Sequence, residues 1–262
     1  MPDRNSLDKK RGFSMKEKGV FISLFVLMLI ASNLSFAKTS FIFPVEIDYT
    51  NPETYLSPGT QSEINPKYIE TIEREIGPVP HTLNGIAKIL QWLGKGFKHY
   101  NGGGRTVGKS TINKLLETRL LSGCHDDGLV FSCALRHFGF PAVMADTAGI
   151  EWALVYNRNN PYSGHVFIEV CVQGKWILLD SNSGEYIEDY DPYNPVIPIT
   201  KRIESKGYYV LYKGIDPAGY GVTDIKILKA KMDQFAQVVG KLNLEYPPYT
   251  ISRFKRPNNN RP

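Results

Sequence analysis

One cysteine of the sequence lies where a thiol becomes a nucleophile. Cys124 follows Gly123 and begins an apolar segment that is predicted to be a helix as far as Phe138. The unpaired N–H groups and the dipole at a helix N terminus stabilise a thiolate, and the same N–H groups can bind a developing oxyanion. We therefore predict that Cys124 is a catalytic nucleophile. Cys133 and Cys171 lack such a position and are predicted to be structural, either as free thiols or as a pair.

Two segments downstream of this cysteine are predicted to form a β-hairpin. Residues 164–172 and 175–180 have the alternation and the β-branched content of strands. Gln173-Gly174 between them suits a two-residue turn. In the register that this turn sets, Phe167 lies opposite Asp180.

This register brings a histidine and a carboxylate together. His165 shares the sheet face of Phe167 because side chains alternate along a strand, so Asp180 is its diagonal neighbour, about 7 Å away between Cα atoms. A histidine with an orienting carboxylate is the base that a cysteine nucleophile requires. Cys124, His165 and Asp180 are therefore the predicted catalytic residues, with Asn182 as the alternative orienting residue.

Other polar residues near these positions are given structural roles. His125 adjoins the nucleophile, but successive helix residues point apart, so it is predicted to line the rim of the pocket or to cap the helix. Asp126 and Asp127 suit the first helical turn because the dipole favours negative charge there. Trp92 falls within an amphipathic segment and is predicted to be a core residue.

The elements that must position these residues follow from periodicity and from breaking residues. Helices are predicted over 67–76, 82–100, 110–121, 124–138 and 222–242, and strands over 143–147, 152–156, 166–172, 175–180 and 208–212. Helices followed by hairpin-linked strands and a final helix indicate an α+β domain with an antiparallel sheet. Residues 38–65, rich in Pro, Asn and Ser, are predicted to be a linker or a surface extension.

Four segments resemble the transglutaminase-like cysteine peptidase superfamily, whose fold is papain-like. The nucleophile helix and its following turn span 123–142, the histidine strand 164–170 and the aspartate strand 174–180, and an upstream helix spans 89–100. The resemblance covers roughly residues 84–213. It implies a Cys-His-Asp triad at the N terminus of a buried helix packed on an antiparallel sheet. It also implies reactions that pass through a thioester: peptide hydrolysis, deamidation or transamidation.

One motif points to a different chemistry. Residues 103–110 match the phosphate-binding pattern G-x-x-x-x-G-K-S letter for letter. That pattern requires a buried strand before it, whereas residues 95–101 are polar, so we interpret the segment as a glycine loop that can border the substrate cleft. The histidines and cysteines show no metal-ligand spacing, and no metal or cofactor is expected.

The N terminus is predicted to direct export. Basic residues at 16–18, an apolar run over 20–30 and small residues at Ser35 and Ala37 form a secretory signal cleaved after Ala37, with an uncleaved anchor as the alternative. Six of the 31 Lys and Arg and three of the 26 Asp and Glu lie in residues 1–37, so only +2 of the net charge of +5 remains in the rest of the chain. No nucleic-acid partner is therefore expected.

The predicted organisation is a signal peptide over 1–37, an N-terminal extension over 38–80, a transglutaminase-like catalytic core over 81–215, and a C-terminal helix with a basic tail over 216–262. The expected function is that of an exported cysteine-dependent acyl-transfer enzyme on amide bonds, a peptidase that is secreted or periplasmic. Protein transglutaminase or deamidase activity, and a non-catalytic binding module with the same fold, are the alternatives. The expected partner is a protein or peptide substrate, and the membrane is contacted only through an uncleaved N-terminal segment. The oligomeric state is left open.

Overall fold

The computed structural model describes residues 46–254, apart from residues 103, 158, 160, 202 and 203. The predicted signal peptide over 1–37 and the part of the basic tail after residue 254 lie outside the described residues. None of the helices within the described part of the chain is both long and apolar enough to cross a membrane.

The helices mostly precede the strands along the chain. They are η1 (Pro52–Leu56), α2 (Pro66–Ile76), α3 (Leu83–Gly96), α4 (Ile112–Thr118), α5 (Cys124–His137), α6 (Ile150–Leu154), α7 (Ile225–Val238) and η2 (Val239–Lys241). The strands are β1 (Lys98–His99), β2 (Leu120–Leu121), β3 (Ala142–Gly149), β4 (Gly164–Val172), β5 (Lys175–Leu179), β6 (Glu185–Ile187), β7 (Val196–Ile197), β8 (Tyr208–Gly214) and β9 (Ile251–Arg253).

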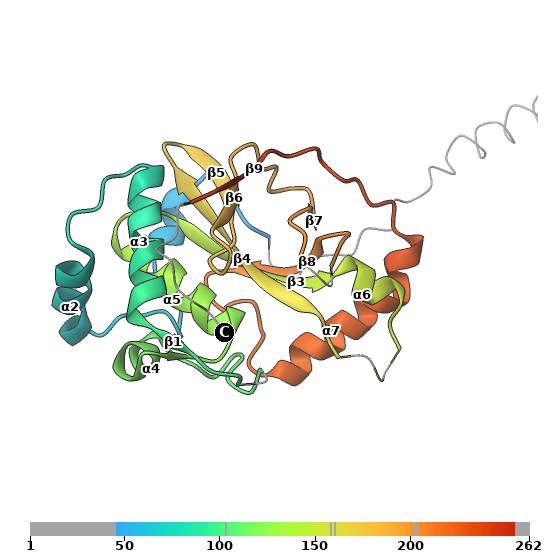
Figure 1. The fold of residues 1–262 in the computed structure, drawn as a ribbon, viewed down its shortest axis with the longest axis horizontal. Coiled ribbons are helices and arrows are strands. Elements are labelled where there is room, and N and C mark those ends of the chain that lie inside the picture. The colour runs from blue at the N-terminus through green and yellow to red at the C-terminus, as the bar shows by residue number, and fades with distance from the viewer. Residues whose placement is uncertain (1–45, 103, 158, 160, 202–203, 255–262) are drawn as a thin grey trace, which may run out of the picture. The chain divides into compact units, whose positions relative to one another are not determined.

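The main sheet has the strand order β7-β8-β3-β4-β5-β6-β9, and every neighbouring pair in it is antiparallel. The fold is therefore α+β, as predicted. The short strands β1 and β2 pair in parallel outside this sheet. Helix α5 packs against α3 and against strands β3 and β4, and α7 packs against α6 and β8 (Figure 1).

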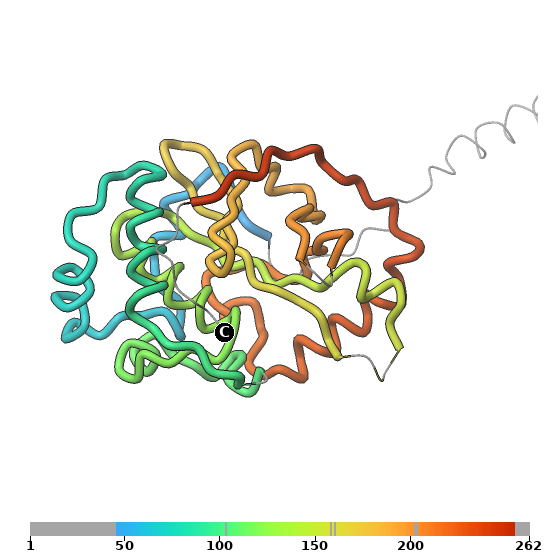
Figure 2. Tube along the Cα trace, in the orientation of Figure 1, coloured from blue at the N-terminus to red at the C-terminus, as the bar shows by residue number. Residues whose placement is uncertain are grey.

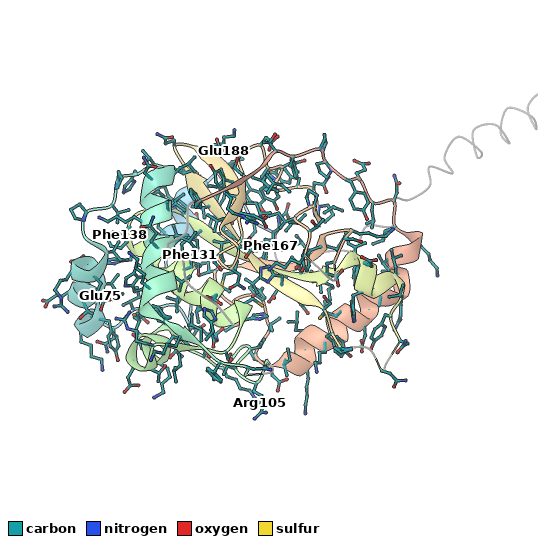
Figure 3. The ribbon with its side chains drawn as sticks, viewed as in Figure 1. Glu75, Arg105, Phe131, Phe138, Phe167 and Glu188 are labelled. Atoms are coloured by element: carbon teal, nitrogen blue, oxygen red, sulfur yellow. The ribbon has the colours of Figure 1, made fainter. Side chains whose placement is uncertain are left out.

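Helix α5 is the buried helix that the sequence predicts. Its residues from Asp126 to Arg136 are all buried. The closest approach to the sheet is at Gly128, where an added Cβ would lie 2.8 Å from Cγ1 of Val166 on β4. Phe131 of α5 and Phe167 of β4 lie in the interior, while the exposed Arg105 and Glu188 lie at the periphery (Figure 3). Dense packing on several sides fixes the position of the N terminus of α5.

The hairpin between β4 and β5 has the predicted register. Val172 pairs with Lys175, and Ile168 pairs with Leu179, so the next pair in the series would be Phe167 and Asp180. The turn residues have φ of 52° at Gln173 and 75° at Gly174, which is the left-handed backbone that a two-residue turn of this kind requires.

Two predicted helices are shorter than expected. The segment 82–100 is helical only to Gly96, and the segment 110–121 only to Thr118. Gly94 and Gly96 weaken the first helix, and Arg119 leaves the second in the left-handed conformation at φ 55°. The residues beyond each helix, 98–99 and 120–121, pair with one another as β1 and β2. Strand pairing between these two segments thus outweighs the helical periodicity at the C-terminal end of each helix.

The predicted strand over 152–156 is wrong, because residues 152–154 form the second half of α6. The side chain of Glu151 accepts hydrogen bonds from the backbone N–H and the Oγ of Ser205, and Trp152 N–H donates to Glu204 at 3.3 Å. These contacts with the loop before β8 hold a single helical turn. A five-residue apolar run is too short for its periodicity to separate a helix from a strand.

The sequence analysis also missed the short strands at the edges of the sheet. Strand β7 has two residues, and β6 and β9 have three each. After α7 and η2 the chain runs back along the sheet, red in Figure 2, and places β9 beside β6. Strands this short lack a clear alternation, and their pairing depends on distant parts of the chain.

Candidate active site

Cys124 is the first residue of α5, and its side chain is partly exposed. The buried carboxylate of Asp126 accepts hydrogen bonds from the backbone N–H and the Oγ of Ser122, both at 2.8 Å, and so fixes the entry to the helix. The N–H of Cys124 belongs to the first turn, whose donors have no acceptor within the helix. The sulfur therefore lies in the positive field of the helix terminus.

His165 and Asp180 meet as the hairpin register predicts. Nε2 of His165 lies 2.8 Å from Oδ1 of Asp180, and both side chains are almost wholly buried. The Asp180 carboxylate also accepts hydrogen bonds from the backbone N–H of Asn182 at 2.8 Å and from Oγ of Ser183 at 2.7 Å. The orienting carboxylate on His165 is thus that of Asp180, and Asn182 helps to hold it through its backbone.

The structure brings His165 to Cys124 as well. His165 lies near enough to the sulfur to lower the pKa of the Cys124 thiol. Since Nε2 of the imidazole faces Asp180, Nδ1 is the nitrogen that remains for the sulfur. The ring packs edge-on against Phe167, with centroids 4.8 Å apart, and its orientation is further limited by Tyr208 at 5.9 Å. The imidazole is therefore held in one orientation from two sides.

Electrostatics in the site favour a charged resting pair. Burial raises the pKa of the Cys124 thiol, but hydrogen bonds from His125 and His165, and their charges, outweigh burial and lower this pKa to about 6. Burial lowers the pKa of the His165 imidazole, but the adjacent Asp180 carboxylate outweighs burial and raises it to about 9. Between these two values the sulfur is a thiolate and His165 an imidazolium.

A second histidine touches the sulfur, although its side chain was expected to point away from that of Cys124. Nδ1 of His125 lies 3.9 Å from Sγ of Cys124, and Nε2 lies 2.7 and 2.9 Å from the two carboxylate oxygens of Asp146 on β3. Tyr220 donates a hydrogen bond of 2.7 Å to the same carboxylate. Side chains of adjacent residues do diverge on a helix, but their Cα atoms are only about 3.8 Å apart, and Asp146 turns this ring back toward the sulfur.

Lys201 adds a further charged group beside His165 and Asp180. Nζ of Lys201 lies 2.8 Å from Nε2 of His165 and 3.2 Å from Oδ2 of Asp180, with the lysine side chain about one-third exposed. Asp146, Tyr220 and Lys201 were all missed by the sequence analysis. Asp146 is the charged residue of a strand whose other residues are uncharged, which is a signal that could have identified it.

The other predicted residues have the structural roles expected for them. Trp92 is buried and donates to Glu75 at 2.7 Å. Asp127 is buried in the first turn of α5, 3.4 Å from Nε2 of His99. Cys133 and Cys171 are buried free thiols, so the alternative that they pair with each other is wrong. Burial raises the pKa of both thiols, to about 12 for Cys133.

Residues 104–110 of the glycine loop lie between β1 and α4 in the chain. Thr106 of this loop is hydrogen-bonded to Oγ of Ser122 and lies 3.4 Å from the Asp126 carboxylate. The strand before the loop has two exposed residues and pairs only with β2, so it is not the buried strand that a phosphate-binding loop requires.

Comparisons with known proteins find similarity to solved structures. No family model matches the chain, and no curated protein matches its sequence. A protein from Cytophaga hutchinsonii to which cysteine protease activity is attributed is 17% identical, with a TM-score of 0.47 over 68% of this chain and 51% of the other. A TGase is 14% identical, with a TM-score of 0.31 over 88% of this chain and 58% of the other.

The chain thus spans 51% and 58% of the lengths of these two proteins. The arrangement that the superfamily resemblance implies is visible in the chain itself. A cysteine begins a buried helix, a histidine lies near the start of one strand of an antiparallel sheet, and an aspartate follows the neighbouring strand.

Proposed function

We propose that the protein is an exported cysteine-dependent enzyme that acts on amide bonds by acyl transfer, and that it is a peptidase, whose substrate bond is a peptide bond and whose acyl acceptor is water. One observation supports this most: His165, whose Nε2 is held 2.8 Å from Asp180, lies beside the Cys124 sulfur at the N terminus of α5 and lowers the pKa of its thiol. A nucleophile, a base and an orienting group in this order are what thiol acyl transfer needs.

In the proposed acylation, the Cys124 thiolate attacks the carbonyl carbon of a substrate amide, and the carbonyl oxygen takes up the negative charge. The backbone N–H of Cys124 is the proposed donor to this oxyanion. The His165 imidazolium then gives its proton to the amide nitrogen. The C–N bond breaks, the amine leaves, and a thioester of Cys124 remains beside a neutral His165.

In the proposed deacylation, the neutral His165 removes a proton from an incoming water molecule. The water oxygen attacks the thioester carbon, the C–S bond breaks, and the acid product leaves. The thiolate and the imidazolium are then restored, so that the cycle needs no further reagent. A primary amine in place of water would give an amide product, which is transglutaminase activity by the same thioester.

The activity is tested by incubating the full chain with a mixed peptide library in the presence of a primary amine. We expect cleaved peptides in the wild type, and none with Cys124→Ala. Cys133→Ala, a buried thiol on the same helix, is the matched control and should retain activity. Amine-linked products without cleavage would replace the peptidase by a transglutaminase. Equal product formation by Cys124→Ala would refute the proposed nucleophile.

Export is the second part of the proposal, and it is supported by the order of basic, apolar and small residues in 1–37. The intact mass of the chain recovered outside the cytoplasm tests it. We expect a chain that begins at Lys38. A full-length chain in the membrane fraction would favour the uncleaved anchor, and a full-length chain in the cytoplasm would contradict export.

A further inference from the structure

Cys124 is flanked by two imidazoles, each of which is bound to a buried carboxylate. His125 presents Nδ1 to the sulfur and Nε2 to Asp146. His165 presents Nε2 to Asp180 in the same way, which leaves its Nδ1 for the sulfur. The proposed acyl-transfer reaction requires only one of these pairs, so the other has no assigned role.

The two pairs differ in how firmly each imidazole holds its proton. Both oxygens of Asp146 lie within 2.9 Å of Nε2 of His125, and the His125 and Asp146 side chains are 11% and 1% exposed. At His165, by contrast, the Lys201 ammonium lies 2.8 Å from Nε2 and shares the Asp180 carboxylate. A neighbouring cation favours release of a proton, and a carboxylate that is shared with no cation favours its retention.

In both pairs the carboxylate raises the pKa of the imidazole. Burial lowers the pKa of the His125 imidazole, but the Asp146 carboxylate outweighs burial and raises it well above 6.5. The corresponding balance at His165 gives a pKa of about 9. Both imidazoles are therefore protonated in the resting site, and the Lys201 ammonium beside Nε2 of His165 favours loss of the proton from His165.

The remaining groups around the sulfur leave this balance unchanged. They are Tyr208 on β8, Tyr220 after β8, and Asp126 and Asp127 on α5 itself. Burial keeps the pKa of both phenols above 10, so they stay neutral. Asp126 is directed to Ser122, and Asp127 lies by His99.

We propose that His125, fixed by Asp146, is the permanent cation that keeps the Cys124 sulfur ionised, and that His165 is thereby left to move the proton. In acylation His125 stabilises the attacking thiolate and stays protonated while His165 protonates the leaving amine. In deacylation it stabilises the same thiolate as the leaving group when the C–S bond breaks. His125 therefore touches a reacting atom without transferring a proton. This inference rests on the proposed acyl-transfer function.

The test is the pH dependence of Cys124 alkylation by iodoacetamide on the full chain, followed by peptide mass spectrometry, which needs no substrate. His125→Gln should label at least about tenfold more slowly at pH 6.5, because the thiol pKa moves toward the free value of about 8.5. Asp146→Asn should shift the labelling midpoint in the same direction. His165→Ala should keep its labelling rate at pH 6.5 within about threefold of the wild type, yet lose peptide cleavage by about 10²-fold or more.

His137→Gln is the matched control, because His137 ends the same helix and pairs with Glu73 on the surface. It should label and cleave like the wild type. The cleavage lost in His125→Gln at pH 6.5 should recover toward pH 8.5, a rescue that a merely structural role would not give. Asp146→Asn serves in its place if His125→Gln fails to fold, as judged by thermal melting.

Two results would overturn the inference. The first is an unchanged labelling profile in folded His125→Gln and Asp146→Asn. The second is loss of fast labelling in His165→Ala, which would make His165 the cation responsible. Both leave the proposed function intact. That function fails separately if wild-type Cys124 labels no faster than a free thiol, or if Cys124→Ala cleaves peptides.

Discussion

At the scale of single residues, the proposed site depends on the buried carboxylate of Asp180. Asp180 is fully buried, and its two oxygens contact His165, Lys201, Ser183 and the backbone of Asn182. The charge of His165 and these donors hold the pKa of Asp180 far below its usual range, although burial opposes them. The carboxylate therefore stays ionised and fixes which nitrogen of His165 faces the sulfur.

Replacing this carboxylate by an amide should disable the base while preserving the packing. In Asp180→Asn we expect kcat/KM for peptide cleavage to fall by about 10³-fold, because His165 loses its charged orienting partner. Steady-state kinetics on a cleaved peptide measure the change. Asp189→Asn, at an exposed aspartate in the segment after β6, is the control. A loss of less than about threefold in Asp180→Asn would remove Asp180 from the mechanism.

The two charged partners also predict the pH dependence of the reaction. The thiolate must form, so kcat/KM should rise as pH passes the Cys124 pKa of about 6. His165 must carry a proton, so kcat/KM should fall again as pH passes its pKa of about 9. A bell-shaped profile with these two limbs is expected from initial rates between pH 5 and pH 10. A single rising limb near pH 8.5 would show that the resting thiol is not ionised.

At the scale of elements, the β4–β5 hairpin aligns His165 with Asp180. Its turn is exposed, and a Cβ added at Gly174 would meet nothing within 4 Å, so substitutions there act through the backbone alone. Both turn residues have positive φ. Any loss of this turn would loosen the register that sets the distance between the two side chains.

Two substitutions in the turn should have opposite effects. Gly174→Ala should destabilise the protein by about 1–2 kcal/mol, because alanine is strained at φ 75°. Gln173→Asn should stabilise it by a few tenths of a kcal/mol, since asparagine tolerates this conformation better. Urea unfolding of the two variants measures both changes. Equal stability of the three proteins would show that the turn contributes nothing to the hairpin.

The hairpin and the nucleophile helix were predictable because their signals are local. The position of Gly123 and Cys124 before an apolar run, and the turn at Gln173, lie within a few residues of what they determine. The pair of His125 and Asp146 was not predictable in this way. It joins α5 to a residue of β3 21 positions later, and only the packing of the helix on the sheet brings the two together.

Helix α6, which was predicted as a strand, was likewise not predictable from local sequence, because distant residues determine its conformation. The contacts of α6 with Glu204 and Ser205 come from about 50 residues later in the chain. The same holds for β9, whose partner β6 lies more than 60 residues earlier. Local propensity is a weak guide wherever such distant contacts decide the conformation.

At the scale of the whole molecule, segments outside the expected catalytic core of residues 81–215 pack against that core. Ile47 and Tyr55 pack with Trp176 of β5, and Phe235 of α7 stacks on Tyr209 of β8. Behind the sheet, the buried pair of Lys213 and Glu169, 2.5 Å apart, is joined by hydrogen bonds from Tyr49 and Tyr190 to the Glu169 carboxylate. The fold is thus held by packing and by buried polar contacts.

The stability of the protein should accordingly not depend on whether its cysteines are kept under reducing or oxidising conditions. All three cysteines are free, and Cys133 and Cys171 lie in the interior. We expect the Tm to agree within about 1 °C with and without dithiothreitol, since loss of a disulfide would cost about 2–5 kcal/mol. Differential scanning calorimetry of the purified chain tests this. A Tm that drops by several degrees on reduction would reveal a disulfide.

Cys124 is proposed to be a reactive thiolate, and competition of the three cysteines for a limiting alkylating reagent tests this directly. The native chain is treated with a limiting amount of iodoacetamide at pH 7, and the label on each cysteine is quantified by peptide mass spectrometry. We expect rapid labelling of Cys124 with an apparent pKa of about 6, while Cys133 and Cys171 stay unlabelled until the chain unfolds. Equal and slow labelling of all three cysteines would contradict it.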